Sequence, residues 1–190
     1  MDYYLLLKFG HIIGFMLLGG GLLAVWVSEF QAYRTVDMKE FADASRYTAR
    51  FYDSLVIPGA ILVGTTGFFL VLELGVGFFE APWVVAMWGL FVFEFIEGNT
   101  ITRIQFLRTL RRSRKALEGG NELTEDVRQD ARSLPGQIAH FLDLPMVVVI
   151  VYCGTLRPES WSVVFSAIGI ALVVTAFLVV FVPRLARYTR

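Results

Sequence analysis

Two histidines and a few carboxylates are the residues of this 190-residue chain whose chemistry needs explaining, because they lie in apolar sequence. His11 lies within the run YYLLLKFGHIIGFMLLGGGLLAVW, with Lys8 about one helical turn before it. An ionisable side chain at the centre of a bilayer costs about 2.5–3.5 kcal/mol, so it requires a physical reason. A neutral imidazole in an apolar slot could be an axial ligand of haem iron. It could equally form a hydrogen bond to a neighbouring helix or to a water molecule.

A second group combines acidic side chains with the other histidine. Glu94 and Glu97 are three residues apart, as are His140 and Asp143, so each pair shares a face of its helix. Carboxylates beside an imidazole can bind a divalent metal ion or relay protons. The alternative is an acid–base cluster that neutralises itself or pairs with Arg103. Pro145 follows closely, and we expect it to loosen the helix and to free a backbone carbonyl.

The composition indicates where these residues lie. Hydrophobic residues make up 56% of the chain and charged residues only 18%, which is typical of an integral membrane protein. The single cysteine, Cys153, excludes a disulfide within the chain. With one cysteine and two histidines, a closed zinc site is not expected.

Five segments are long and apolar enough to cross about 30 Å of hydrocarbon, which takes roughly 20 residues in a helix. We therefore predict an all-α bundle of five transmembrane helices. The third and fourth segments reach spanning length only by including ionisable residues, and we accept both because half-spans would leave backbone groups unsatisfied in lipid. The five cores are residues 4–27, 54–74, 82–93, 144–156 and 161–182.

The distribution of basic residues predicts the orientation. Of the 17 lysine and arginine residues, all but Lys8 and Arg157 lie in the first and third connections and the C-terminal tail. The positive-inside rule makes that face cytoplasmic, with the N-terminus outside and the C-terminus inside. The basic residues concerned are Arg34, Lys39, Arg46, Arg50, Arg103, Arg108, Arg111, Arg112, Arg114, Lys115, Arg128, Arg132, Arg184, Arg187 and Arg190.

We interpret residues 1–190 as a single transmembrane domain with a cytoplasmic loop at residues 103–134. The loop should begin as an extension of the third helix, turn at Gly119-Gly120-Asn121 and form a short polar helix before Pro135. A basic run followed by an acidic run could indicate nucleic-acid binding, but juxtamembrane positive charge favours contact with anionic lipid headgroups, and we expect no nucleic-acid partner.

Depth within the membrane decides which residues could share a cofactor. At 1.5 Å per residue, His11 lies roughly 10 Å below the outer surface, and roughly 15 Å from His140 along the membrane normal. A haem held by both histidines of one chain is therefore disfavoured. Met87 lies at the depth of His11, with Tyr152 and Cys153 nearby, and histidine–methionine ligation of haem iron is known chemistry.

Several stretches resemble a family of bacterial predicted integral membrane proteins that forms a domain-of-unknown-function family. They are LLLKFGHIIGFMLLGGGLLAVW, DSLVIPGAILVGTTGFFLV, WVVAMWGLF and the exit Leu156-Arg157-Pro158. The first helix is also similar to those of HemJ-type protoporphyrinogen oxidases and CopD-type copper-resistance proteins. In the HemJ type, a histidine of the first helix and a lysine four residues after a tryptophan of the third are the implicated haem ligands. His11 matches that histidine, but Met87 stands four residues after Trp83, which argues against the oxidase activity while leaving haem ligation open.

Three functions remain open at this point. The first is a small b-type haem protein of the bacterial inner (cytoplasmic) membrane, with His11 and Met87 as axial ligands. The second is a non-catalytic subunit of a larger complex, or of a homo-oligomer, whose aromatic faces pack against partners or lipid. The third is a metal or proton transporter that uses Glu94, Glu97, His140 and Asp143. The sequence alone does not decide whether the chain is an enzyme.

Overall fold

Long helices form the scaffold in the computed structural model, which describes residues 2–120, 122–128 and 133–188. No strand occurs among these residues. Residues 38–73 form one unbroken helical stretch, and so do residues 82–118. Each contains a short π-helical segment between two α-helical parts. The elements are α1 (Tyr3–Arg34), α2 (Met38–Phe51), η1 (Tyr52–Val56), α3 (Ile57–Glu73), α4 (Pro82–Glu97), η2 (Gly98–Thr102), α5 (Arg103–Glu118), α6 (Glu125–Arg128), α7 (Leu134–Leu156) and α8 (Trp161–Tyr188).

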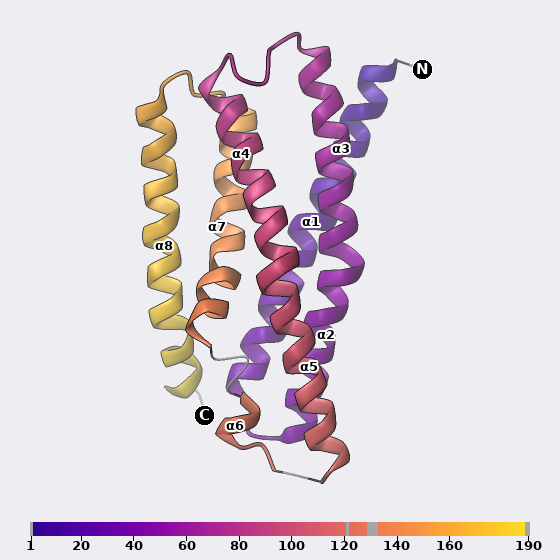
Figure 1. Cartoon of the computed structure of the whole chain (residues 1–190), viewed down its shortest axis with the longest axis vertical. Helices are drawn as coiled ribbons and strands as arrows, with labels where there is room; N and C mark the ends of the chain where they lie inside the picture. The colour runs from indigo at the N-terminus through magenta and orange to yellow at the C-terminus, as the bar shows by residue number, and fades with distance from the viewer. Residues whose placement is uncertain (1, 121, 129–132, 189–190) are drawn as a thin grey trace.

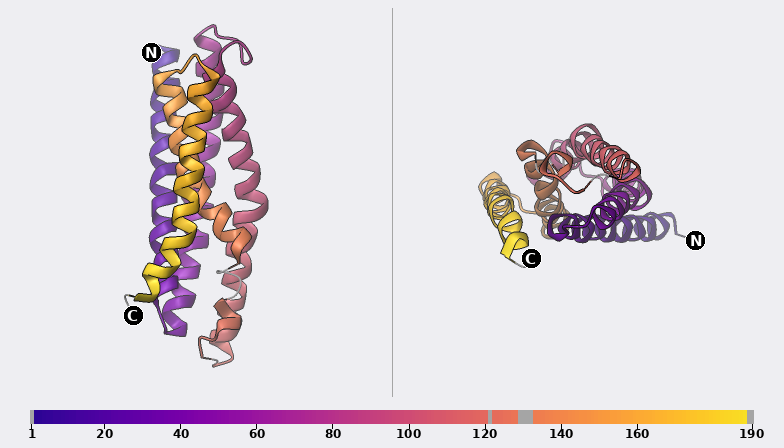
Figure 2. Two further views of the ribbon diagram at one scale, coloured as in Figure 1. Left: turned by 90° about the vertical axis from the view of Figure 1, so that its left-hand side faces the viewer. Right: turned by 90° about the horizontal axis from the view of Figure 1, so that it is seen from below.

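Five helical stretches are long and apolar enough to span a membrane, which confirms the predicted bundle. They run roughly parallel, with the N-terminus, the α3–α4 connection and the α7–α8 connection at one end (Figure 1). α8 lies at the edge of the bundle when it is viewed along its axis (Figure 2). The stretches are Tyr3–Arg34, Met38–Glu73, Pro82–Glu118, Leu134–Leu156 and Trp161–Arg184.

Several helices extend beyond the expected apolar cores. α1 continues through Glu29 to Arg34, and the helix that contains α4 continues through the basic residues of α5. The predicted loop at residues 103–134 therefore begins with four turns of helix. Helical hydrogen bonds satisfy the backbone N–H and C=O groups at the boundary of lipid and water as well as within the lipid. A helix can therefore continue into polar sequence, and apolar composition alone predicts that it ends too early.

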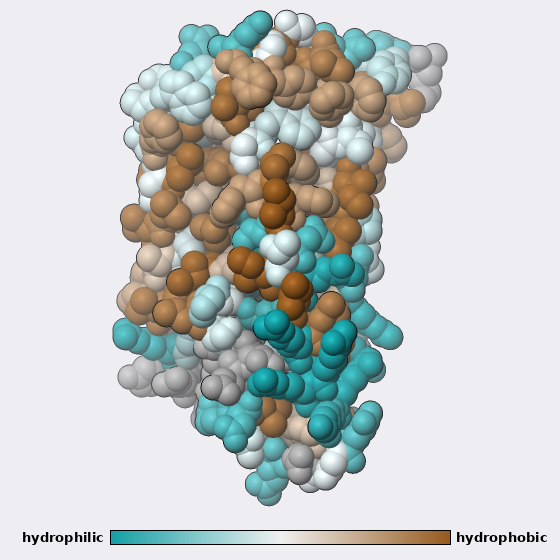
Figure 3. All heavy atoms as spheres, in the orientation of Figure 1, coloured by the Kyte–Doolittle hydropathy of each residue, from teal (hydrophilic) through white to brown (hydrophobic). Residues whose placement is uncertain are grey.

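Polar side chains gather at the end of the bundle that holds α5 and α6, whereas apolar side chains cover the opposite part (Figure 3). The turn after α5 forms at Gly120, which has a φ of +65°. The predicted turn residue Asn121 and the stretch 129–132 lie outside the described residues, as does Arg190. The side of the membrane on which each end lies stays a prediction from the charge distribution.

The glycines of α1 serve two different purposes. A methyl group at Gly14 would lie 2.9 Å from the backbone nitrogen of Val63, and one at Gly21 would lie 3.0 Å from that of Val56. These glycines let α1 approach η1 and α3 closely, as small residues do between membrane helices. Gly19 and Gly20 face open space. A small-residue face can admit either another helix or a flat ligand, and at Gly14 and Gly21 the close partner is another helix.

We expect Gly59→Ala to destabilise the protein by about 1–3 kcal/mol, because the added methyl would overpack the α1–α3 contact. That methyl would lie 2.9 Å from the Cα atom of Leu18 and 3.0 Å from the carbonyl oxygen of Gly14, and neither backbone atom can rotate away. Thermal unfolding of the purified protein in detergent would measure the change. Gly19→Ala is the matched control, since it adds the same methyl in open space. Equal stability of both variants would contradict this account of the contact.

Pro145 lies inside α7 without ending it. Proline has no backbone N–H, so the carbonyl of Phe141, four residues earlier, loses its partner within the helix. The hydroxyl of Thr175 on α8 donates to this carbonyl at 3.4 Å. The carbonyl that Pro145 frees therefore contributes to the contact between α7 and α8.

Candidate functional site

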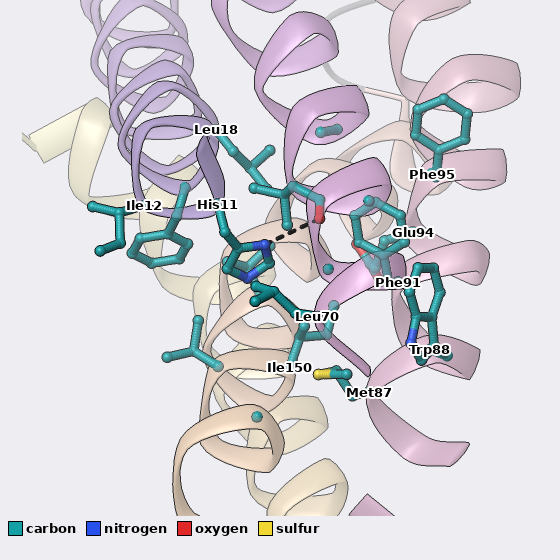
Figure 4. Close-up of a pocket in the computed structure, with 18 of the residues that line it drawn as sticks. His11, Ile12, Leu18, Leu70, Met87, Trp88, Phe91, Glu94, Phe95 and Ile150 are labelled. Atoms are coloured by element: carbon teal, nitrogen blue, oxygen red, sulfur yellow. Dashed lines mark hydrogen bonds between the residues drawn. The ribbon is translucent and has the colours of Figure 1, made fainter. Parts of the chain in front are cut away.

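A cavity of about 540 Å³ lies among α1, α3, α4 and α7. Most of its lining is aliphatic and aromatic, and Trp83 of α4 contributes a ring to it. Trp88 and Phe91 contribute two further rings from the same helix (Figure 4). Its size falls within the roughly 300–1,000 Å³ that is usual for small-molecule sites. His11 and Met87 both line it. The structure thus brings the two predicted ligands from α1 and α4 to one cavity.

The hydrogen bonds of His11 fix its tautomer. Nδ1 lies 3.1 Å from the carbonyl oxygen of Val63 and 3.1 Å from Oγ1 of Thr66. The carbonyl can only accept, and the Thr66 hydroxyl already donates to the carbonyl of Leu62, so Nδ1 carries the proton. Nε2 is left with a lone pair and has no hydrogen-bond partner among the described residues. A ring nitrogen held in this way is the usual arrangement of a histidine that ligates a metal.

Two glycines make room for these side chains. A methyl at Gly67 would lie 3.1 Å from Cε1 of His11, so the absence of a side chain there lets the imidazole rest against α3. A methyl at Gly154 would lie 3.2 Å from Sδ of Met87. Gly154 therefore leaves space on α7 for the thioether that points into the cavity (Figure 4).

The end of the cavity near the N-terminus carries positive charge. Lys8 lies one turn from His11 on the same face of α1, and Arg157 follows the last turn of α7. The Arg157 guanidinium lies over the ring of Trp83, 5.2 Å from its centroid. Both cations are exposed, and neither has an ion-pair partner among the carboxylates of the described residues. We call this part, lined by Lys8 and Arg157, the cationic end.

The opposite part of the cavity carries carboxylates. Glu94 and Asp143 line it, and a carboxylate oxygen from each, together with one from Glu97, lies within 4.8 Å of the others. Glu97 and Asp143 are buried. Three buried carboxylates so close together require compensating positive charge, either protons or a cation. We call Glu94, Glu97 and Asp143 the carboxylate cluster.

Both π-helices border this cluster. η2 begins directly after Glu97, and its Thr102 donates a hydrogen bond to Oε1 of Glu97 at 3.0 Å. η1 carries Tyr52, whose hydroxyl packs against Gly98 at the start of η2. Oε2 of Glu97 is buried and lacks a hydrogen-bond partner among the described residues. Single π-helical turns within long helices frequently occur at functional sites.

His140 does not join the carboxylate cluster, although the sequence grouped it there. Its Nε2 lies 3.1 Å from a carboxylate oxygen of Glu29 on α1, and its ring packs beside Trp26 and Phe106. It does not line the cavity. His140 and Asp143 are three positions apart in α7, but the two side chains meet different neighbours, Glu29 of α1 for His140 and the carboxylates of α4 for Asp143.

Arg103 is also placed differently from the alternative that the sequence left open. Its Nε donates to Oδ1 of Asp53 at 2.8 Å, and both side chains are partly exposed. The arginine pairs with Asp53 of the α2–α3 helix instead of neutralising the carboxylate cluster.

Sequence reasoning missed Glu29, Tyr52 and Thr66 as parts of these sites. Only Glu29 could have been found from the sequence. No helix-ending residue lies between the apolar run and Glu29, so the first helix should continue through this carboxylate.

Comparison with known sequences agrees with the helical membrane architecture. The model of a family described as "Predicted integral membrane protein (DUF2269)" matches residues 5–158. The match covers most of the chain, so the chain belongs to this family, as its motifs indicated. Comparisons with curated proteins and with solved structures find no match. The more distant similarity to HemJ-type and CopD-type proteins stays a prediction.

Proposed function

We propose that this chain, as a member of that family of predicted integral membrane proteins, binds a b-type haem in its cavity and serves in electron transfer. The observation that supports the proposal is the state of His11. Its Nδ1–H is committed to the Val63 carbonyl, while Nε2 keeps a free lone pair beside an apolar cavity. Neutral imidazole of this kind is the commonest protein ligand of haem iron.

The other residues of the cavity fit the same ligand. Met87 offers a thioether from the facing helix α4, and histidine–methionine pairs ligate haem in cytochromes. Trp83, Trp88 and Phe91 provide flat apolar surface for a macrocycle, while Gly64, Gly67 and Gly154 leave space beside them. A bound haem would supply reversible one-electron chemistry. The chain would hold it, orient it and exclude water from it. The bacterial inner membrane is the location that the family resemblance implies.

We expect Met87→Leu to retain haem but to change its optical spectrum. Leucine fills nearly the same volume as methionine, so the cavity keeps its shape while the sulfur ligand is lost. The reduced variant should bind carbon monoxide at the vacated position, which the reduced wild-type protein should resist. Absorption spectra of haem-loaded protein in detergent would measure both effects.

Met146→Leu is the matched control for that experiment. Met146 is buried in the same hydrophobic cluster as Val149 and Cys153 and does not line the cavity. Its variant should give the wild-type spectrum. If Met87→Leu also gave the wild-type spectrum, Met87 would not be a ligand and the second axial position would belong to another group.

A second candidate function is the transport of a cation or protons, and the carboxylate cluster supports it. Glu94 and Asp143 open onto the same cavity, so a charge bound there would have a path along the bundle. Buried carboxylates within membrane helices often mark ion or proton pathways. Loss of proton or ion flux in Glu97→Gln vesicles, with no change in the haem spectrum, would favour this function over electron transfer.

A further inference from the structure

The two ends of the cavity differ in charge, and this difference constrains the ligand. Lys8 and Arg157 lie at one end, and the carboxylates of Glu94 and Asp143 lie at the other. The middle is apolar and aromatic. A ligand that satisfies all three regions is flat, mainly apolar and acidic at one edge only.

The two cations of the cationic end, Lys8 and Arg157, form no ion pair with any carboxylate of the described residues, so their charges are available to a ligand. Arg157 has a φ of +49°, the only positive φ of a non-glycine residue among those that the structure describes. Arg157 is the C-cap of α7, and its backbone N–H donates to the carbonyl of Cys153. A left-handed residue commonly ends a helix, and here it places the Arg157 side chain at the end of α7. Stacking on Trp83 holds the guanidinium beside the cavity. Its five N–H donors are suited to carboxylate groups.

Lys8 has a defined relation to His11. The two residues are three apart on α1, so the ammonium and the imidazole point to the same side about one turn apart. A ligand centred at His11 Nε2 with its acidic edge toward the N-terminus would meet Lys8. The reverse placement would bring acidic groups against Glu94 and Asp143, where like charges repel.

We infer that Lys8 and Arg157 bind the carboxylates of the cavity's ligand and thereby select a dicarboxylic porphyrin over its neutral esters. This inference rests on the proposed function, because it assigns the orientation of the ligand in the same cavity. Binding through His11 alone would require neither cation and would accept a neutral porphyrin. The inference therefore adds Lys8 and Arg157 as recognition residues and dicarboxylic porphyrins as the ligand class.

The test compares metal-free protoporphyrin with its dimethyl ester, using fluorescence titration of the full-length protein in detergent. Neither probe contains iron, so neither needs His11 as an axial ligand. We expect the wild-type protein to prefer the free acid by about tenfold or more, the scale of hydrogen bonds between charged groups. The Lys8→Gln/Arg157→Gln variant should bind both probes equally. Comparing preferences between variants cancels the unequal partition of the two probes into micelles.

The controls separate the possible failures. Lys39→Gln removes an exposed lysine at the opposite end of the bundle and should keep the wild-type preference. Lys8→Gln alone, at an exposed position, should reduce the preference even if the double variant folds poorly. Equal wild-type affinity for both probes would overturn the inference. Binding of neither porphyrin would overturn the inference alone, because haem could still bind through its iron at His11, and the Soret band of haem-loaded protein tests that separately. A preference for the free acid without a Soret band would overturn the proposed function and leave the carboxylate-binding residues standing.

Discussion

Replacing His11 by alanine is expected to abolish the Soret band of haem-loaded protein. The variant removes the one cavity nitrogen whose lone pair is free, and the remaining thioether of Met87 is a weak ligand on its own. Millimolar imidazole should restore the band, because the truncated side chain leaves a space of matching shape beside Gly67. Absorption spectra of the two proteins, loaded with equal amounts of haem, would measure the loss and the rescue.

The other histidine provides the control. His140→Gln retains a side chain that can donate to Glu29, and His140 does not line the cavity. This variant should therefore keep the wild-type Soret band. A band that persisted in His11→Ala and disappeared in His140→Gln would reverse the assignment. A band that persisted in both variants would contradict axial ligation by either histidine.

The fold could be predicted from the sequence because lipid limits the choices. An apolar run of about 20 residues must satisfy its own backbone, and in an all-α protein that means one spanning helix. The five cores followed directly from this rule. The helix end at Arg34 did not follow from this rule, because a helix that leaves the membrane continues for as long as other helices support it. The extension of the third helix to Glu118 was predicted, but from the Gly119-Gly120-Asn121 turn and not from apolar composition. α5 continues because Phe106 and Ala116 are buried against the rest of the bundle.

The candidate site could be predicted only in part, for a geometric reason. Depth along the membrane normal follows from counting residues, so His11 and Met87 could be placed at the same level. Rotation about each helix axis does not follow from counting. For this reason His140 was grouped with Asp143, whereas the structure turns it toward Glu29. Thr66 could not be identified as the neighbour of His11 without knowing that α1 packs against α3.

The carboxylate cluster leads to the second prediction with a large expected effect, which concerns divalent cations. Oxygen-only sites favour hard ions such as Mn²⁺, Mg²⁺ and Ca²⁺. If the cluster takes such an ion, Mn²⁺ at a hundred times its dissociation constant should stabilise the protein by about 2.7 kcal/mol. Thermal unfolding followed by circular dichroism, with and without Mn²⁺, would measure the shift.

Asp143→Asn should remove this response to Mn²⁺, because it deletes one of the three converging carboxylates. The same substitution should raise the stability of the metal-free protein, since it relieves repulsion among buried like charges. Asp53→Asn is the matched control. Asp53 pairs with Arg103 outside the cluster, so its variant should respond to Mn²⁺ as the wild-type protein does. If Mn²⁺ stabilised neither the wild-type protein nor the control, the three carboxylates would be held together by shared protons, and proton transfer would become the function to test at this end of the cavity.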